Sequence, residues 1–254
     1  MRQRTSRIFT LAILLGFISS VASSYVLLSP ARRWFSTPKT IYIDNGGLAS
    51  VTDADLGVTA AVNATNAWNL GSVTPVVGVA ATVVYALGDG RSDVIFADPL
   101  GICTGNCLAA TTTGYYNTGS KACCDGLDLV QLTDADVCFN TSYNFTSASE
   151  PDGCSSEIYL ETVTTHEIGH VIGLGHSANS GAVMYASVSY CNNKLMNSDD
   201  VNGRDALYDC AVLTFQACGA GPPPTCKVKG VSCTVNSECC SNRCRGRSPS
   251  KICG

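Results

Sequence analysis

Histidine is scarce in this chain: only three histidines occur in 254 residues, and all of them lie between residues 166 and 176. A cysteine protease needs a histidine as its base. No histidine outside this short window is available to any of the fifteen cysteines, which argues against that class. Long internal repeats are also absent, and no segment after residue 24 is apolar over a membrane-spanning length. The length then allows one main globular domain with a small module beside it.

The first 24 residues are typical of a signal peptide. Three arginines precede an almost unbroken apolar run at Ile8–Val21, and small residues at 22 and 24 favour cleavage before Tyr25. A membrane anchor is the alternative, but the apolar run is short for a span. Fifteen cysteines fit the oxidising compartment that a signal peptide implies, and their odd number leaves at least one thiol free or paired between molecules. We therefore expect a secreted, extracellular protein.

Charge and cysteine spacing divide the rest of the chain. Residues 25–225 hold 7 Lys and Arg against 19 Asp and Glu, whereas residues 226–254 hold 6 Lys and Arg against Glu238 alone. The three prolines in Gly219–Thr225 predict a stiff spacer between these parts. We expect a main domain over 25–218, a linker over 219–225 and a cysteine-rich module over 226–254.

The C-terminal module resembles a knottin, or inhibitor cystine knot. Its six cysteines include a central adjacent pair, and the resemblance implies the pairing Cys226–Cys240, Cys233–Cys244 and Cys239–Cys253. Disulfides would stabilise a segment too small to bury an adequate core. A metal-binding tail is the alternative. The basic module could bind an anionic surface or a receptor, or it could simply block exoproteolysis.

Periodicity and turn residues predict short strands and three helices in the main domain. Helices are expected from Thr52 or Asp53 to about Leu70, at Ile158–Ile172, and at Ser198–Tyr208 with Ser198 as its cap. Strands are expected at Thr40–Ile43, Thr82–Tyr85, Asp93–Ala97 and Asp136–Asn140. Residues 98–126 are rich in Gly, Thr and Cys and predict a long disulfide-pinned loop. Among the nine cysteines of residues 103–218, Cys103–Cys107 and Cys191–Cys210 are candidate bridges.

The histidine window has the pattern HExxHxxGxxH, which predicts a catalytic zinc site. His166 and His170 are four residues apart and so share one face of a helix. Gly173 lets the chain leave the helix and return His176 as a third ligand. Three protein ligands leave one position for water, as in catalytic rather than structural zinc sites. Glu167 lies about 100° round the helix, where it can act as general base and then as general acid.

These residues resemble the metzincins, and within them the matrixins. Ser177 follows the third histidine, Ala182–Tyr185 resembles the Met-turn with Met184 beneath the zinc, and Asp199–Tyr208 resembles the closing matrixin helix. The resemblance spans about residues 32–210. It implies an α+β fold in which a twisted mixed sheet and about three helices hold an active-site cleft below an edge strand, where peptide substrate would bind by β-augmentation.

Three departures from the family refine these expectations. No histidine remains for the second, structural zinc of animal matrixins, so we predict one zinc. No cysteine precedes Cys103, so the family's cysteine-based latency is absent. The segment after Met184 lacks the usual proline, which puts the shape of the specificity pocket in doubt. The chain is thus closer to a compact microbial-type matrixin than to a vertebrate collagenase.

Calcium is a second candidate cofactor, because carboxylate oxygens suit Ca²⁺. A solvated acidic surface is the alternative. The candidates lie near predicted strands at Asp89, Asp93, Asp98, Asp125, Asp128, Asp134 and Asp136.

The sequence thus predicts a zinc metalloendopeptidase that hydrolyses internal peptide bonds. Zinc would be bound by His166, His170 and His176, with Glu167 as the catalytic residue. We expect a monomer that acts on protein or peptide and has no nucleic-acid partner. One rival is a non-catalytic, toxin-like binding protein on a metalloprotease scaffold. The other is a zinc amidase that acts on cell-wall peptide.

Overall fold

A computed structural model of the chain describes residues 24–36, 38–51, 56–69, 76–80, 85–116, 121–147, 154–211, 213–219, 244–245 and 251–253. The predicted signal peptide therefore lies outside the described residues except for Ser24. The predicted linker does so except for Gly219. Among the described residues, no helix has both the length and the apolar character needed to cross a bilayer.

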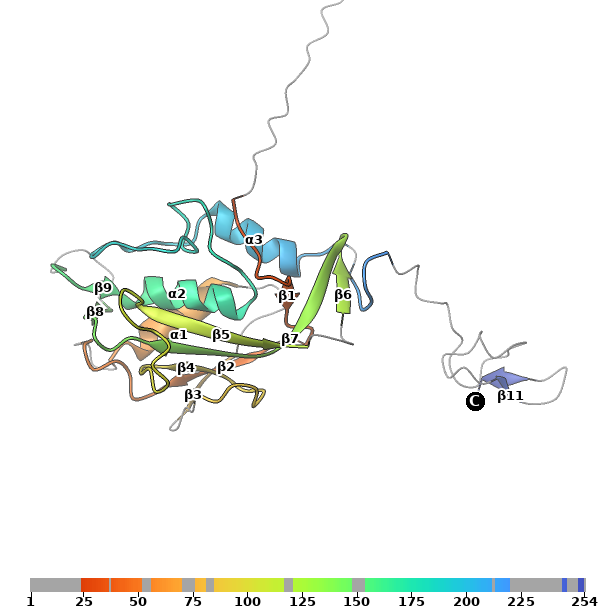
Figure 1. Cartoon of the computed structure of the whole chain (residues 1–254), viewed down its shortest axis with the longest axis horizontal. Helices are drawn as coiled ribbons and strands as arrows, with labels where there is room; N and C mark the ends of the chain where they lie inside the picture. The colour runs from red at the N-terminus through yellow and green to blue at the C-terminus, as the bar shows by residue number, and fades with distance from the viewer. Residues whose placement is uncertain are drawn as a thin grey trace, which may run out of the picture.

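One mixed sheet of eight strands forms the centre of the structure (Figure 1). Its main path runs β10–β6–β7–β4–β2–β3, and β1 and β5 also pair with β7. The β2, β3, β4 and β7 strands are parallel, whereas β5 and β6 run antiparallel to β7. The strands are β1 Arg32–Arg33, β2 Thr40–Asp44, β3 Val76–Ala80, β4 Ser92–Ile95, β5 Ala109–Tyr115, β6 Lys121–Cys124, β7 Leu127–Phe139 and β10 Leu213–Thr214.

Alternation along β7 separates two environments. Ala135 and Val137 join the main hydrophobic core, to which all three described helices also contribute buried residues, whereas Cys138 packs in a smaller cluster. Such a period of two is what a pleated strand imposes. Asp136 shares the Cys138 parity and is completely buried. Between Asp134 and Phe139, β7 therefore places Ala135, Val137 and Phe139 in the core with the helices, and its two aspartates on the opposite face.

Three helices occur among the described residues: α1 Val58–Ala67, α2 Leu160–Val171 and α3 Ser198–Tyr208 (Figure 1). The α1 helix begins later than predicted because Gly57 has a left-handed conformation, with φ 87°. Asn197, and not Ser198 as predicted, caps α3, because its side chain accepts from the backbone N–H of Asp199 and Asp200. The α2 helix is almost wholly buried and carries the histidine window.

Several strand predictions need correction. Residues 98–126 are not one loop, because they contain β5 and β6. The short strand predicted at Asp136–Asn140 is the end of the 13-residue β7. The strand predicted at Thr82–Tyr85 lies mostly outside the described residues, and β3 precedes it. Ile158–Tyr159 forms the short strand β9, which pairs with β8 Phe145–Thr146 before α2 begins.

Four disulfides join described residues of the main domain. Cys103–Cys107 is confirmed, and the adjacent Cys123 and Cys124 have different partners, as expected. The predicted Cys191–Cys210 bridge is wrong. The bonds are Cys103–Cys107, Cys123–Cys218, Cys124–Cys210 and Cys154–Cys191, and Cys138 is free and buried.

Little of the C-terminal module is described. Cys244–Arg245 (β11) pairs antiparallel with Ile252–Cys253 (β12), and Cys244 is disulfide-bonded. The other cysteines of the predicted knottin, apart from Cys253, lie outside the described residues, so the knottin stays a prediction.

Candidate metal centre

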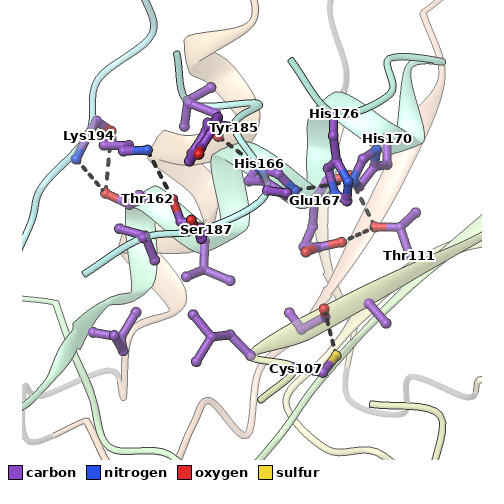
Figure 2. Close-up of a pocket in the computed structure, with 18 of the residues that line it drawn as sticks. Cys107, Thr111, Thr162, His166, Glu167, His170, His176, Tyr185, Ser187 and Lys194 are labelled. Atoms are coloured by element: carbon purple, nitrogen blue, oxygen red, sulfur yellow. Dashed lines mark hydrogen bonds between the residues drawn. The ribbon is translucent and has the colours of Figure 1, made fainter. Parts of the chain in front are cut away.

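The α2 helix presents His166 and His170 on one face, toward an open cleft (Figure 2). Both side chains are half-buried. Two indole groups bond to the backbone of this helix: Trp68 donates to the carbonyl of Thr165 and Trp34 donates to that of Val171, each at 2.9 Å. These contacts fix the helix on which two of the candidate ligands depend.

Gly173 ends the helix and turns the chain toward His176. Its φ is 110°, a conformation that side chains rarely adopt. A Cβ atom there would also collide with the backbone carbonyl of Arg32. The predicted role of this glycine as the exit from the helix therefore has two physical causes, its conformation and the close approach of β1.

The three imidazole rings meet at one point. Their centroids are 4.8, 4.9 and 5.1 Å apart, and one ring nitrogen from each lies within 4.8 Å of the others. Nδ1 of His166 lies 2.8 Å from the carbonyl oxygen of Val183, and Nδ1 of His170 lies 2.7 Å from that of Leu174. A carbonyl can only accept, so each Nδ1 carries the proton and each Nε2 presents a lone pair.

The Nε2 lone pairs of His166 and His170 face each other at a distance that favours a bound cation. Nε2 of His166 and Nε2 of His170 are only 3.1 Å apart. Burial is the main cause that lowers the pKa of both imidazoles to about 4. Both rings are therefore neutral near pH 7. Two facing lone pairs repel unless a positive ion lies between them. Neutral imidazole is also the form that binds a metal, so the donor set fits a divalent ion such as zinc.

Glu167 lies beside the three rings and is 5% exposed. The Thr111 hydroxyl on β5 donates to Glu167 Oε2 at 2.6 Å (Figure 2). Burial raises the pKa of the Glu167 carboxyl, while the neighbouring His170 and the Thr111 hydrogen bond lower it. The carboxyl is thus held in a dry place next to the candidate metal ligands. The role of Thr111 could not be seen in the sequence, because it comes from a segment predicted to be a loop.

Met184 lies in a turn that packs under the histidines. Its sulfur occupies the space that a Cβ on Gly169 would need, so Met184 touches the helix between His166 and His170. Asp200 on α3 holds this turn by accepting from the backbone N–H of Val183 and of Met184, each at 3.0 Å. The sequence predicted the position of Met184. It did not predict that Asp200, assigned from the sequence only to the last helix, would support the Met184 turn.

The cleft next to the histidines has a volume of about 570 Å³. One wall is the start of β5 with the residues before it, and the other is α2 with the segment from Tyr185 to Lys194. Among the described strands, β5 pairs with β7 alone, so its other edge is unpaired. The expected edge strand therefore lies at the cleft.

The seven aspartates considered for calcium do not all lie together. Asp93 on β4 and Asp134 and Asp136 on β7 are neighbours, and the Asp93 N–H donates to Asp136 Oδ1 at 3.1 Å. Asp125, just before β7, and Asp128, near its start, serve a different purpose. They accept hydrogen bonds from the backbone N–H groups of Ala211 and Cys218, respectively. Among the described residues, two groups bring three possible ligands within 4.8 Å: the histidine triad, and Glu157 with two cysteines. Those cysteines are bonded to each other as Cys154–Cys191. Calcium binding stays a prediction.

Comparison with known proteins shows that the segment carrying this site is similar to the matrixins. Residues 112–209, from within β5 to just after α3, match the family profile of the matrixins. The chain is 36% identical over 70 residues to interstitial collagenase of Sus scrofa, which covers 28% of this chain and 15% of the collagenase. It is 47% identical over 55 residues to metalloendoproteinase 4-MMP of Arabidopsis thaliana, covering 21% and 16%.

A third relative, neutrophil collagenase of Homo sapiens, is 34% identical over 74 residues, which is 28% of this chain and 16% of that protein. The aligned segments thus span about 15–16% of the length of these relatives. The mixed sheet and three helices fit a matrixin catalytic domain, and the match to the matrixin profile covers residues 112–209.

Proposed function

We propose that this chain is a secreted zinc-dependent endopeptidase. The observation that carries the proposal is the meeting of three imidazoles beside a buried carboxyl and an unpaired strand edge. His166, His170 and His176 would hold the zinc. Bound there, the ion would supply Lewis acidity, which activates a water molecule and polarises a peptide carbonyl group.

Glu167 would move the protons in this reaction. As a carboxylate it takes a proton from the attacking water, and as a carboxylic acid it gives that proton to the departing amine. The Thr111 hydroxyl engages Oε2 at 2.6 Å and leaves Oε1 for the transfer. Burial raises the pKa of this carboxyl, which favours an acid that can return its proton near neutral pH.

The β5 strand would hold the substrate. A peptide in extended conformation can add to an unpaired strand edge through main-chain hydrogen bonds, while pockets select its side chains. Ala109, Ala110 and Thr111 line the cleft, so a peptide paired with them would pass next to Glu167. This placement favours attack on a bond within a chain rather than at its end.

Secretion is part of the proposal. Its support is the leader-like start of the sequence together with four disulfides in the main domain. We further propose a single catalytic zinc, and a basic C-terminal module that binds an anionic surface or receptor. A calcium ion near the buried aspartates of β4 and β7 would be a structural addition to this enzyme.

The test compares two matched substitutions on α2. Glu167→Gln should lower the casein-degrading activity of the purified full chain by about 10³-fold. Glu161 lies on the same helix but does not line the cleft, so the Glu161→Gln substitution should leave the activity unchanged. A chelator should abolish the wild-type activity, and added zinc should restore it. Equal, chelator-insensitive activities of both variants would eliminate an enzyme of this type.

Mass spectrometry of the products separates this proposal from the amidase. New termini within unmodified polypeptides are expected. Failure to cut any internal peptide bond, combined with cleavage of cell-wall peptide, would favour the amidase.

A further inference from the structure

The cleft contains a cation on one wall. Lys194 lies at the end of the segment that follows the Met184 turn, and Figure 2 shows its side chain directed toward Ser187 and Tyr185. The ammonium donates to the carbonyl oxygen of Ser187 at 3.0 Å and lies 4.9 Å from the centre of the Tyr185 ring. These contacts place a positive charge beside the cleft, on the His166 side of the site.

Backbone and covalent contacts hold this wall in place without the Lys194 side chain. The Lys194 backbone N–H donates to the Thr162 hydroxyl at 3.0 Å, and that hydroxyl also lies 3.1 Å from Asn193 Oδ1. Nearby, Cys191 is bonded to Cys154 and its N–H donates to the carbonyl of Glu157. The fold of this wall therefore does not depend on the ammonium, whose charge is available to a ligand in the cleft.

That charge has no anionic partner in the described part of the cleft. Lys194 is the only Lys or Arg among the lining residues, Glu167 is the only carboxylate, and no described carboxylate lies within 4.0 Å of the ammonium. The carboxylate of Asp200 acts on this ammonium electrostatically, but its oxygens already accept from backbone N–H groups. An ammonium has three N–H donors, and the structure gives this one a single hydrogen bond.

A lysine at this place is unusual in a domain with few cations. Residues 25–225 contain 7 Lys and Arg against 19 Asp and Glu, so the general field of the domain repels acidic peptides. Half-burial removes part of the water from the ammonium and lowers its pKa. An incoming carboxylate would restore the lost solvation through a charge-assisted hydrogen bond.

The direction of β5 shows which part of a substrate would reach Lys194. The lining residues of β5 come from its first half, Ala109 to Thr111, so the cleft lies at the start of the strand. A peptide antiparallel to β5 has its carboxyl-terminal half at that end. The cleft would thus receive a side chain that follows the cleaved bond.

We propose that Lys194 makes this site selective for peptides with an acidic side chain, aspartate or glutamate, immediately after the cleaved bond. This inference rests on the proposed endopeptidase function and names the substrate class of the same site. Lys194 is a specificity-determining residue here, and it takes no part in the proton transfers.

The test measures kcat/KM for four fluorogenic peptides that differ only at the position after the cleaved bond, which carries Glu, Gln, Leu or Lys. The parent sequence is taken from the best-cleaved member of a random peptide library. For the wild-type chain we expect Glu to exceed Gln by about tenfold, the effect of one charge-assisted hydrogen bond. Because each ratio is measured within one enzyme sample, it does not depend on the fraction of folded protein.

Substitutions then assign the selectivity to the charge. Lys194→Met should bring the Glu to Gln ratio to about one, Lys194→Arg should keep it, and Lys194→Glu should favour the Lys peptide. Lys121→Met serves as the matched control, because Lys121 is exposed on β6 and does not line the cleft. Its ratio should equal that of the wild type.

The outcomes separate this inference from the proposed function. Cleavage of all four peptides with a Glu to Gln ratio near one in the wild type overturns the inference and leaves the endopeptidase standing. A tenfold ratio that persists in Lys194→Met overturns the role of Lys194. If no peptide is cleaved at all, the proposed function falls and this inference falls with it.

Discussion

Replacing Asp200 with alanine should loosen the candidate metal centre without touching any of the three histidines. The carboxylate accepts from the backbone N–H groups of Val183, Met184 and Asn197, at 3.0, 3.0 and 2.9 Å. Val183 and Met184 are each 2% exposed, so water cannot replace their lost acceptor. A buried donor without a partner costs about 1–3 kcal/mol. Two such donors imply a loss of about 4 kcal/mol in the free energy of unfolding.

Thermal denaturation converts this loss into a measurable shift. For a domain of roughly 150–250 residues, 1 kcal/mol lowers Tm by about 2–4 °C, so Asp200→Ala should lower it by about 8–16 °C. The binding of zinc should weaken as well, because the Val183 carbonyl fixes the ring of His166 at 2.8 Å. Loss of such support beyond the ligands typically costs 10- to 100-fold in metal affinity.

Asp209→Ala provides the control for this experiment. Asp209 is an exposed aspartate just after the same helix, and its removal should change Tm by no more than 1–2 °C, as is usual for surface sites. The reasoning would be refuted if Asp200→Ala shifted Tm as little as the control did, or if it unfolded the domain more easily while zinc affinity stayed at the wild-type value.

Two further predictions concern the far face of β7. Burial first, and then the charge of Asp134, raise the pKa of Asp136 to about 7, whereas an unfolded aspartate titrates near about 3.9. The folded state therefore binds this proton more tightly, and the free energy of unfolding should fall as the pH rises from about 4 through 7. In calcium-free buffer, Asp136→Asn should be more stable than wild type at pH 8 but not at pH 4. Parallel Tm profiles of the two proteins would contradict this. Burial, with a smaller effect of Asp98, also raises the pKa of the Cys138 thiol to about 12. Iodoacetamide should therefore leave Cys138 unmodified in the native chain and alkylate it in denaturant without reductant. Mass spectrometry that found the adduct on native protein would show the thiol to be accessible.

The parts of the site that the sequence could predict are those fixed over short distances. A spacing of four residues places His166 and His170 on one helix face regardless of the rest of the fold. The need for a glycine at 173 follows from the change of direction after the helix, and the structure adds the close approach of Arg32 as a second cause.

The parts that could not be predicted depend on contacts between distant segments. The β5 strand was mistaken for a loop because its threonines and glycine lack an apolar pattern, and only its register with β7 reveals it. Thr111 reaches Glu167 across 56 residues of sequence, so neither residue signals the other. Cys191 was given the wrong partner for the same reason, since cysteine pairing follows from which segments the fold brings together.

The Cys124–Cys210 disulfide makes the support of the candidate site depend on the redox state of the solution. It joins β6 to the residue just after Asp209, and so anchors the helix that carries Asp200. Closing a loop of 86 residues stabilises the fold by about 4–5 kcal/mol on the chain-entropy estimate. Reduction of this bond would remove that constraint on the helix whose Asp200 holds the Met184 turn beneath the histidines. The support beneath the candidate site is therefore complete only where this disulfide can form, in an oxidising compartment.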